Sequence, residues 1–125
     1  MANNKGMVQF GGVILINDKL RDPFVDRLFE AVLLLQNQEE CYSFFEDIAT
    51  VSELKSLAQR LEVAKMLEKE CTYTLIAELT GASTATISRV KRSLNYGADG
   101  YKLVLRRLAE RAPNSKDGEM AADET

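Results

Sequence analysis

The sequence predicts an all-α fold of about six helices that includes a helix-turn-helix. Apolar residues recur at helical spacing, capping signals precede the periodic segments, and no segment carries a strong strand pattern. The chain has 125 residues, 46% of them hydrophobic, and this length fits one domain. We divide it into a loose N-terminal arm over residues 1–17, a helical domain over 18–111 and a disordered acidic tail over 112–125.

The first two predicted helices carry many large apolar side chains. The first covers about residues 23–36, because Asp22 is an N-cap residue and Pro23 stands at the first helical position. Its apolar residues at helical spacing are Phe24, Leu28, Val32 and Leu35. The second covers about residues 38–48. Its apolar stripe consists of Cys41, Tyr42, Phe44, Phe45 and Ile48. The two helices together form a broad apolar face.

The third predicted helix is the longest. Thr50 and Glu53 have the spacing of a capping box, in which each side chain accepts a hydrogen bond from the other residue's backbone N–H. The helical period continues from there to about Lys69. Its expected inward residues are Leu54, Leu57, Leu61, Ala64 and Met66 or Leu67.

Three shorter helices are predicted after it. Thr72 caps the first of them, over about 73–80, and Gly81 ends it. Its expected buried residues are Leu75, Ile76 and Leu79. Ser83 or Thr84 opens the next, which reaches about Asn95. Its expected inward residues are Ala85, Ile87, Val90 and Leu94.

The last predicted helix, over about 101–111, follows a linker at residues 96–100 that contains two glycines. Its expected inward residues are Leu103, Val104 and Leu108. Its expected outward residues are Lys102, Arg106, Arg107 and Arg111.

Charge is distributed unevenly along the chain. Residues 84–111 hold seven basic and two acidic side chains, a balance of +5, whereas the remaining chain has nine basic and seventeen acidic side chains. An acidic protein with one basic end has the charge distribution of a duplex-binding surface, because neutralising phosphates and releasing counterions supply much of the affinity for DNA. The alternative is a merely solvated basic face.

Residues 72–94 combine a short helix, a turn with Gly81 and a second helix, as in a helix-turn-helix. The leading residues of a helix that enters a major groove must be short and able to form hydrogen bonds or methyl contacts with base edges. The candidate base-reading residues are Thr84, Ala85, Thr86 and Ser88. The candidate phosphate contacts are Arg89, Lys91 and Arg92. An ordinary helical hairpin with a Ser/Thr-rich cap would show a similar pattern.

Two blocks of sequence resemble the Trp repressor superfamily, and the nearest match is its Trp repressor-like YerC/YecD group. The blocks are Leu57-Ala58-Gln59-Arg60-Leu61-Glu62-Val63-Ala64 and Gly81-Ala82-Ser83-Thr84-Ala85-Thr86-Ile87-Ser88-Arg89-Val90-Lys91-Arg92-Ser93-Leu94. The likeness extends over about residues 18–111. It implies an intertwined all-helical homodimer, in which the N-terminal helices of two subunits interlock and two helix-turn-helix heads reach successive major grooves of double-stranded DNA. The alternative is that the apolar N-terminal residues pack within one subunit.

The resemblance also implies a candidate effector pocket. In Trp repressor two arginines hold the corepressor tryptophan, and the matching positions are Arg60 and Arg89. A glycine follows the second arginine there, whereas Val90 follows it here, and a bulky group in a packed pocket costs about 1 to 3 kcal/mol. We therefore disfavour a tryptophan corepressor and predict no cofactor. A different small effector stays open, as does a role for both arginines in phosphate or salt-bridge contacts.

The composition excludes most enzyme classes. The chain has no histidine, no paired-cysteine metal spacing and no glycine-rich phosphate loop, so we predict neither catalysis nor a metal site. It has no apolar run long enough to cross a membrane. Cys41 and Cys71 are expected to be buried thiols in a reducing cytoplasm.

The preferred function is a sequence-specific, double-stranded DNA-binding regulator, in particular a repressor, acting as a homodimer. The alternative is a helical protein-interaction module with the same fold and no specific DNA binding.

Overall fold

The computed structural model describes residues 18–111, and this range contains helices and no strand. The elements are η1 (Asp18–Leu20), α1 (Pro23–Leu33), α2 (Gln38–Ile48), α3 (Val51–Glu68), α4 (Tyr73–Thr80), α5 (Thr84–Tyr96) and α6 (Gly100–Arg111). The predicted all-α fold with six α-helices is confirmed. The predicted arm over residues 1–17 and tail over residues 112–125 lie outside the described residues.

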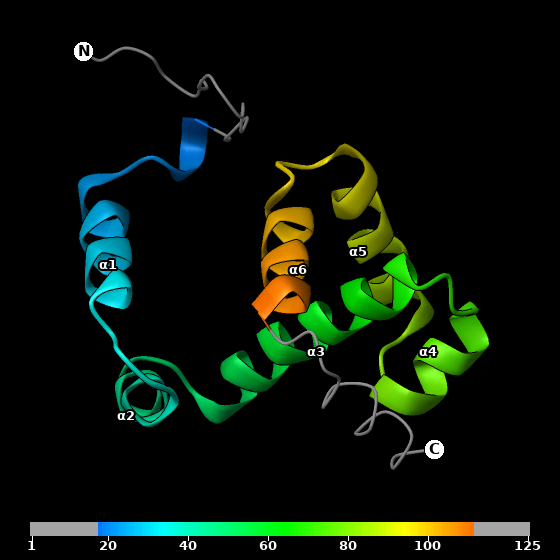
Figure 1. Ribbon diagram of the computed structural model, residues 1–125, viewed down its shortest axis with the longest axis horizontal. Helices are drawn as coiled ribbons and strands as arrows, with labels where there is room; N and C mark the ends of the chain where they lie inside the picture. The colour runs from blue at the N-terminus through cyan, green and yellow to red at the C-terminus, as the bar shows by residue number, and fades with distance from the viewer. Residues whose placement is uncertain (1–17, 112–125) are drawn as a thin grey trace.

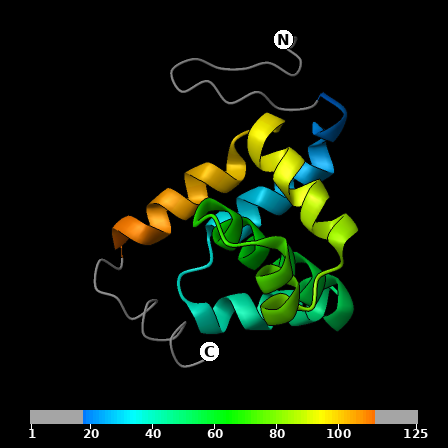
Figure 2. The ribbon, with the colours of Figure 1, turned by 90° about the vertical axis from the view of Figure 1, so that its right-hand side faces the viewer.

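The six helices form a packed group, α3–α6, and a projecting pair, α1 and α2. In Figure 1 the long helix α3 runs from the pair to the group, and α4, α5 and α6 lie around its second half. Figure 2 shows α5 and α6 running to opposite sides from their connection at the top of the view. Helix α3 therefore links the projecting pair to the part of the molecule that contains the helix-turn-helix.

The hydrophobic core lies within the α3–α6 group. Its buried residues are Val63, Ala64, Met66, Ile76, Ala82, Ile87, Val90, Leu94 and Leu105. Helices α4, α5 and α6 all pack on α3. Helices α1 and α2, by contrast, contain no buried residue. Phe24 is 76% exposed and Leu33, on the opposite side of α1, is 82% exposed, so large apolar side chains on both sides of this helix are uncovered within residues 18–111.

Local capping explains where the helices begin. The Thr50 hydroxyl accepts a hydrogen bond from the Glu53 N–H at 3.0 Å, and the Glu53 carboxylate accepts one from the Thr50 N–H at 2.9 Å. The predicted capping box is therefore confirmed. Helices α1, α4 and α5 begin with simpler caps. In each, one side-chain oxygen accepts a hydrogen bond from a backbone N–H of the first turn, and the capping residues are Asp22, Thr72 and Ser83.

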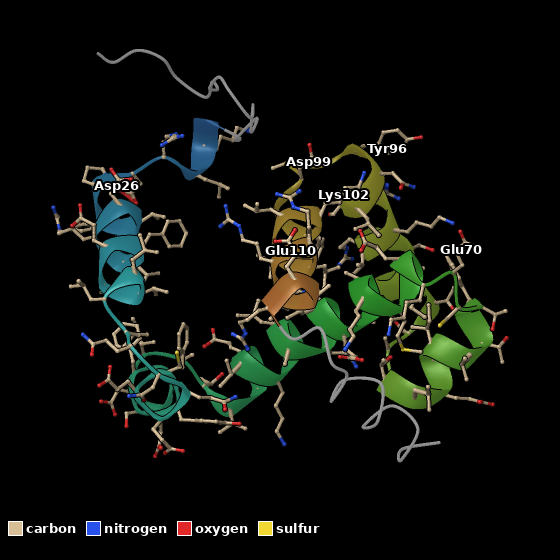
Figure 3. The ribbon with its side chains drawn as sticks, viewed as in Figure 1. Asp26, Glu70, Tyr96, Asp99, Lys102 and Glu110 are labelled. Carbon is tan, nitrogen blue, oxygen red and sulfur yellow. The ribbon has the colours of Figure 1, made fainter. Side chains whose placement is uncertain are left out.

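Helix α3 ends in a Schellman motif. The Cys71 N–H donates to the Met66 carbonyl at 3.0 Å, and the Glu70 N–H donates to the Leu67 carbonyl at 2.9 Å. Glu70 adopts the left-handed conformation that this motif requires, with φ of 62°. Figure 3 places Glu70 at the far end of α3, where the chain turns into α4. A side-chain-bearing residue therefore holds a position that glycine usually occupies.

The connection between α5 and α6 also depends on backbone geometry. Figure 3 shows Tyr96, the last residue of α5, and Asp99 of the connection at the end of the molecule away from α2. The Gly97 N–H donates to the Ser93 carbonyl at 2.8 Å, and a Cβ at Gly97 would overlap that same carbonyl group. Only glycine fits this position, so Gly97 fixes the sharp turn into α6.

Helix α1 ends three residues earlier than predicted, at Leu33 instead of residue 36. The reason is that the next helix uses the following residues for its own cap. The Asn37 side chain accepts from the Glu40 N–H at 2.9 Å, and the Glu40 carboxylate accepts from the Gln36 N–H at 2.9 Å. Residues 36 and 37 therefore belong to the start of α2.

Helical periodicity identified the apolar faces of the helices, but it did not predict which residues of those faces are buried. Several residues expected inside are exposed: Leu57, Leu61, Leu75, Leu79, Ala85, Val104 and Leu108. Leu105, which was not expected inside, is buried. The difference arises because α6 meets α3 through the Leu105 side of the helix, and that crossing cannot be read from the spacing of apolar residues alone.

Candidate nucleic-acid interface

Helices α4 and α5 form the predicted helix-turn-helix. The two are joined by the short turn at residues 81–83. Gly81 has a left-handed conformation with φ of 78°, and its N–H donates to the Ala77 carbonyl at 2.9 Å. Ala82 is only 5% exposed, so the turn is anchored in the core next to the first residues of α5.

Side chains hold this turn on both sides. The Thr80 hydroxyl donates to the Ile76 carbonyl at 2.7 Å and accepts from the Ala82 N–H at 3.1 Å. From α3, the Gln59 side-chain amide donates to the Thr80 carbonyl at 3.0 Å. Gln59 thus binds the last carbonyl of α4, which has no partner within its own helix. This contact fixes the end of α4, and with it the turn into α5, to α3.

The first turn of α5 presents the candidate base-reading residues. Thr84 and Ala85 are exposed, whereas Thr86 and Ser88 are partly buried. Ser83 accepts from the Thr86 N–H at 3.1 Å and donates its own hydroxyl to Thr86 Oγ1 at 3.1 Å. The Thr86 oxygen therefore already accepts one hydrogen bond, while its own proton is available to another acceptor.

The outer face of α5 combines short and basic side chains. Ala85, Ser88, Arg89 and Arg92 follow the i, i+3, i+4, i+7 spacing that places residues on one side of a helix. Ile87, Val90 and Leu94 lie on the opposite side and are buried. Packing of that buried side on α3 and α4 therefore turns the face with Ala85 and Arg92 outward.

The two arginines on this face carry their charge into solvent. Arg89 and Arg92 are exposed, and no acidic side chain of residues 18–111 pairs with either of them. Within α4 and α5 the acidic residue is Glu78, against three basic residues. The exposed side of the helix-turn-helix is therefore positively charged and able to attract a polyanion.

Lys91 occupies a different side of α5 from the two arginines. Its Nζ atom lies 5.9 Å from the centre of the Tyr73 ring, which belongs to the first turn of α4. Sequence reasoning grouped Lys91 with Arg89 and Arg92 and assigned no role to Tyr73 or Gln59. Both omissions involve contacts between residues 18 or more positions apart, for which the local sequence carries no signal.

The candidate effector pocket contains no space at its central position. Val90 is 2% exposed and belongs to the core together with Val63 and Ala64 of α3. Arg60 and Arg89 are exposed. The side chain that follows Arg89 therefore fills the interior between α3 and α5 and serves as part of the hydrophobic core.

Other kinds of site have little support in the described part of the chain. Among residues 18–111, no cluster of three His, Cys, Asp or Glu side chains is suited to bind a metal ion. Over the same residues, no helix has both the length and the apolar character needed to cross a membrane. Cys41 and Cys71 are free thiols, but Cys41 is exposed and Cys71 is only partly buried, so the expectation that both are buried was wrong.

Comparison with known proteins places this geometry in a family. The model of the Trp repressor protein family matches residues 24–109, which extend from the first turn of α1 into the last turn of α6. The uncharacterized protein YerC of Bacillus subtilis is 58% identical over 93 residues, covering 74% of this chain and 89% of YerC. The match thus includes the helix-turn-helix and the projecting pair.

Two crystal structures have the same fold. One, from Staphylococcus aureus and provisionally described as a Trp repressor, has a TM-score of 0.70 at 57% identity and covers 72% of this chain and 90% of that chain. The other, a TrpR-like protein from Eubacterium eligens, has a TM-score of 0.72 at 59% identity and covers 74% of this chain and 96% of that chain. The chain therefore belongs to the Trp repressor family, a family of transcription regulators and not of enzymes, whose helix-turn-helix fold binds DNA.

Proposed function

We propose that this protein is a homodimeric repressor that acts in the cytoplasm and binds specific sequences of double-stranded DNA through α4 and α5. The observation that carries the proposal is the outer face of α5, where short side chains lie beside two arginines that have no acidic partner among residues 18–111. Short side chains let a helix approach base edges in a major groove about 12 Å wide, and unpaired cations suit the phosphates that border it.

The proposed contacts divide into base readout and backbone binding. Thr84, Ala85, Thr86 and Ser88 contact base edges, through hydroxyl hydrogen bonds or methyl groups. Arg89, Lys91 and Arg92 contact phosphates. The division has a physical basis, because the first turn of a recognition helix enters the groove while long basic side chains farther along reach its walls.

Dimerisation is supported by apolar surface that one subunit leaves uncovered. Helices α1 and α2 have no buried residue, and Phe24 and Leu33 are more than three-quarters exposed. The α3–α6 group also has an open, mainly apolar hollow of about 580 Å³, lined by residues that include Leu61 of α3 and Tyr101 and Val104 of α6. A second subunit whose α1 and α2 interlock with these surfaces would remove both from water.

Tryptophan does not act as corepressor in this proposal. The nearly fully buried Val90 would have to move to admit an indole beside Arg89, and forcing extra volume into a packed interior costs about 1–3 kcal/mol. Arg60 and Arg89 are then free to serve DNA binding or to meet a different small effector at the surface.

The deciding experiment selects bound duplexes from a random DNA library, with and without amino-acid metabolites. A two-headed dimer should enrich a palindrome whose half-sites are about one helical turn apart, 10–10.5 base pairs. Enrichment that needs no added tryptophan is expected. If no sequence is enriched and binding disappears at physiological salt, the proposal is wrong and the protein is instead an interaction module that has kept the fold.

A second test concerns the phosphate contacts. Replacing both Lys91 and Arg92 with alanine should weaken binding to all duplexes and reduce the slope of log K against log salt by about 2, close to one unit for each lost phosphate contact. Fluorescence anisotropy at several salt concentrations measures that slope. Lys55→Ala, an exposed change near the start of α3, removes a positive charge outside the helix-turn-helix and should leave the slope unchanged. An unaltered slope in the double variant would remove both residues from the interface.

A further inference from the structure

Lys91 lies on the flank of α5 that faces α4, away from the side that carries Arg89 and Arg92. On a helix with 3.6 residues per turn, Lys91 is separated from Arg92 by about 100° and from Arg89 by about 160° around the axis. Its Nζ atom is 5.9 Å from the centre of the Tyr73 ring, within the range of a cation–π contact. The ammonium group is therefore held next to the first turn of α4.

The Tyr73 ring that contacts the Lys91 ammonium group is itself held by its surroundings. Tyr73 is the first residue of α4, and its side chain is partly buried against the hydrophobic core. The helix start itself is fixed by Thr72, whose hydroxyl accepts from the Leu75 N–H at 3.1 Å. Core packing and the capped helix start hold the ring in place, so the exposed Lys91 side chain has a defined contact on α4, with its Nζ atom 5.9 Å from the ring centre.

We propose that Tyr73 is a positioning residue that holds the Lys91 ammonium for contact with a DNA phosphate on the α4 side of the recognition helix. The inference rests on the proposed function. In helix-turn-helix complexes the first helix crosses the sugar–phosphate backbone, so a cation held against its first turn lies over that backbone. Arg89 and Arg92 extend from another side of α5 and reach other phosphates.

Positioning matters because a free lysine side chain has many rotamers. A side chain that is ordered before binding loses less entropy when the complex forms, so the same charge gives a higher affinity. Removing the ring while keeping the lysine should therefore weaken DNA binding without removing a phosphate contact. This outcome separates a positioning role from a direct contact by Tyr73.

The test is a double-mutant cycle of Tyr73→Leu and Lys91→Ala, measured by fluorescence anisotropy with a random-sequence duplex of about 20 base pairs. Lys91→Ala should weaken binding about 5- to 10-fold and lower the salt slope by about 1. Tyr73→Leu should weaken binding about 2- to 4-fold, as expected for loss of an exposed cation–π contact, and leave the slope unchanged. In the Lys91→Ala background, Tyr73→Leu should have no further effect, because the two residues act through one contact.

Two variants serve as controls. Tyr73→Phe retains the ring face and should bind like the unaltered protein. Tyr96→Leu removes a tyrosine that is 84% exposed at the other end of α5 and should have no effect. Circular dichroism and thermal melting of each variant establish that it is folded under the binding conditions.

Several results would overturn the inference. Additive effects of the two substitutions would show that Tyr73 acts independently of Lys91. Weak binding by Tyr73→Phe would assign the contact to the tyrosine hydroxyl, and a Lys91→Ala variant that melts earlier but binds normally would limit the pair to joining α4 and α5. The results for Tyr73 leave the proposed function unchanged, and normal binding by Lys91→Ala would remove only Lys91 from the proposed phosphate contacts. Failure of the unaltered protein to bind any duplex would overturn both the inference and the proposed function.

Discussion

Val90 is part of the hydrophobic core and also occupies the space where an effector would bind. It is 2% exposed and fills the interior between α3 and α5, directly after a basic residue of the outer face. Val90→Ala should lower the free energy of unfolding by about 1–3 kcal/mol, because it removes two methyl groups from a packed interior and leaves a cavity. Urea denaturation measures the change. Asn95→Ala, an exposed substitution on the same helix, should stay within about 0.5 kcal/mol of the unaltered protein.

The same residue gives a ligand prediction. Tryptophan at millimolar concentration should leave the melting temperature of the unaltered protein unchanged, since a ligand stabilises the folded state only when it binds that state. A rise in melting temperature with tryptophan would show that Val90 moves to admit the ligand, and tryptophan would then be an effector of this protein.

At the scale of elements, the end of α3 is a place where a substitution should make the folded protein more stable. Glu70 adopts a left-handed conformation that costs a side-chain-bearing residue about 1–2 kcal/mol, while glycine loses about 0.5–1 kcal/mol of chain entropy instead. Glu70→Gly should therefore raise the free energy of unfolding by about 0.5–1 kcal/mol, as measured by urea denaturation. The matched control is Glu68→Gly, two residues earlier within α3, which should lower it by about 1 kcal/mol. A loss of stability at both positions would contradict this account of the motif.

The elements also show what sequence reasoning can achieve here. The helix starts at Asp22, Thr50, Thr72 and Ser83 were predictable, because each cap is a short-range interaction between a side chain and a backbone N–H within a few residues. The αL position of Gly81, and with it the helix-turn-helix, was predictable for the same reason. Local chemistry thus suffices to place the elements that carry the candidate interface.

Contacts between distant residues were beyond that reasoning. The hydrogen bond from Gln59 to Thr80 spans 21 residues, and the Tyr73–Lys91 contact joins two helices. Leu105 is buried because of how α6 crosses α3. Each depends on the angle at which two helices meet, and helices with the same apolar spacing can meet at several angles.

At the scale of the whole molecule, the projecting pair gives the sharpest test of assembly. Leu33 is 82% exposed, so aspartate at this position should cost the isolated subunit little. In the proposed dimer the same aspartate would be buried without a partner, which costs several kcal/mol. Leu33→Asp should therefore yield monomers in sedimentation experiments at concentrations where the unaltered protein is dimeric, and the monomers should bind duplexes with weaker affinity.

The control for this substitution is Glu30→Gln, which alters an exposed side chain of the same helix and should leave the dimer intact. A Leu33→Asp variant that remains dimeric would place the subunit contact away from α1. A protein that is monomeric before any substitution would remove the two-headed arrangement from the proposed function.

Helices α1 and α2 contain no fully buried residue, and this has a consequence for the protein at low concentration. If the proposed dimer is what covers these two helices, mass action makes its stability depend on protein concentration, so a diluted sample should melt at a lower temperature than a concentrated one. In a cell, the level of synthesis would then set the fraction of fully formed molecules. A small drop in abundance would reduce occupancy of the target gene more steeply than in proportion.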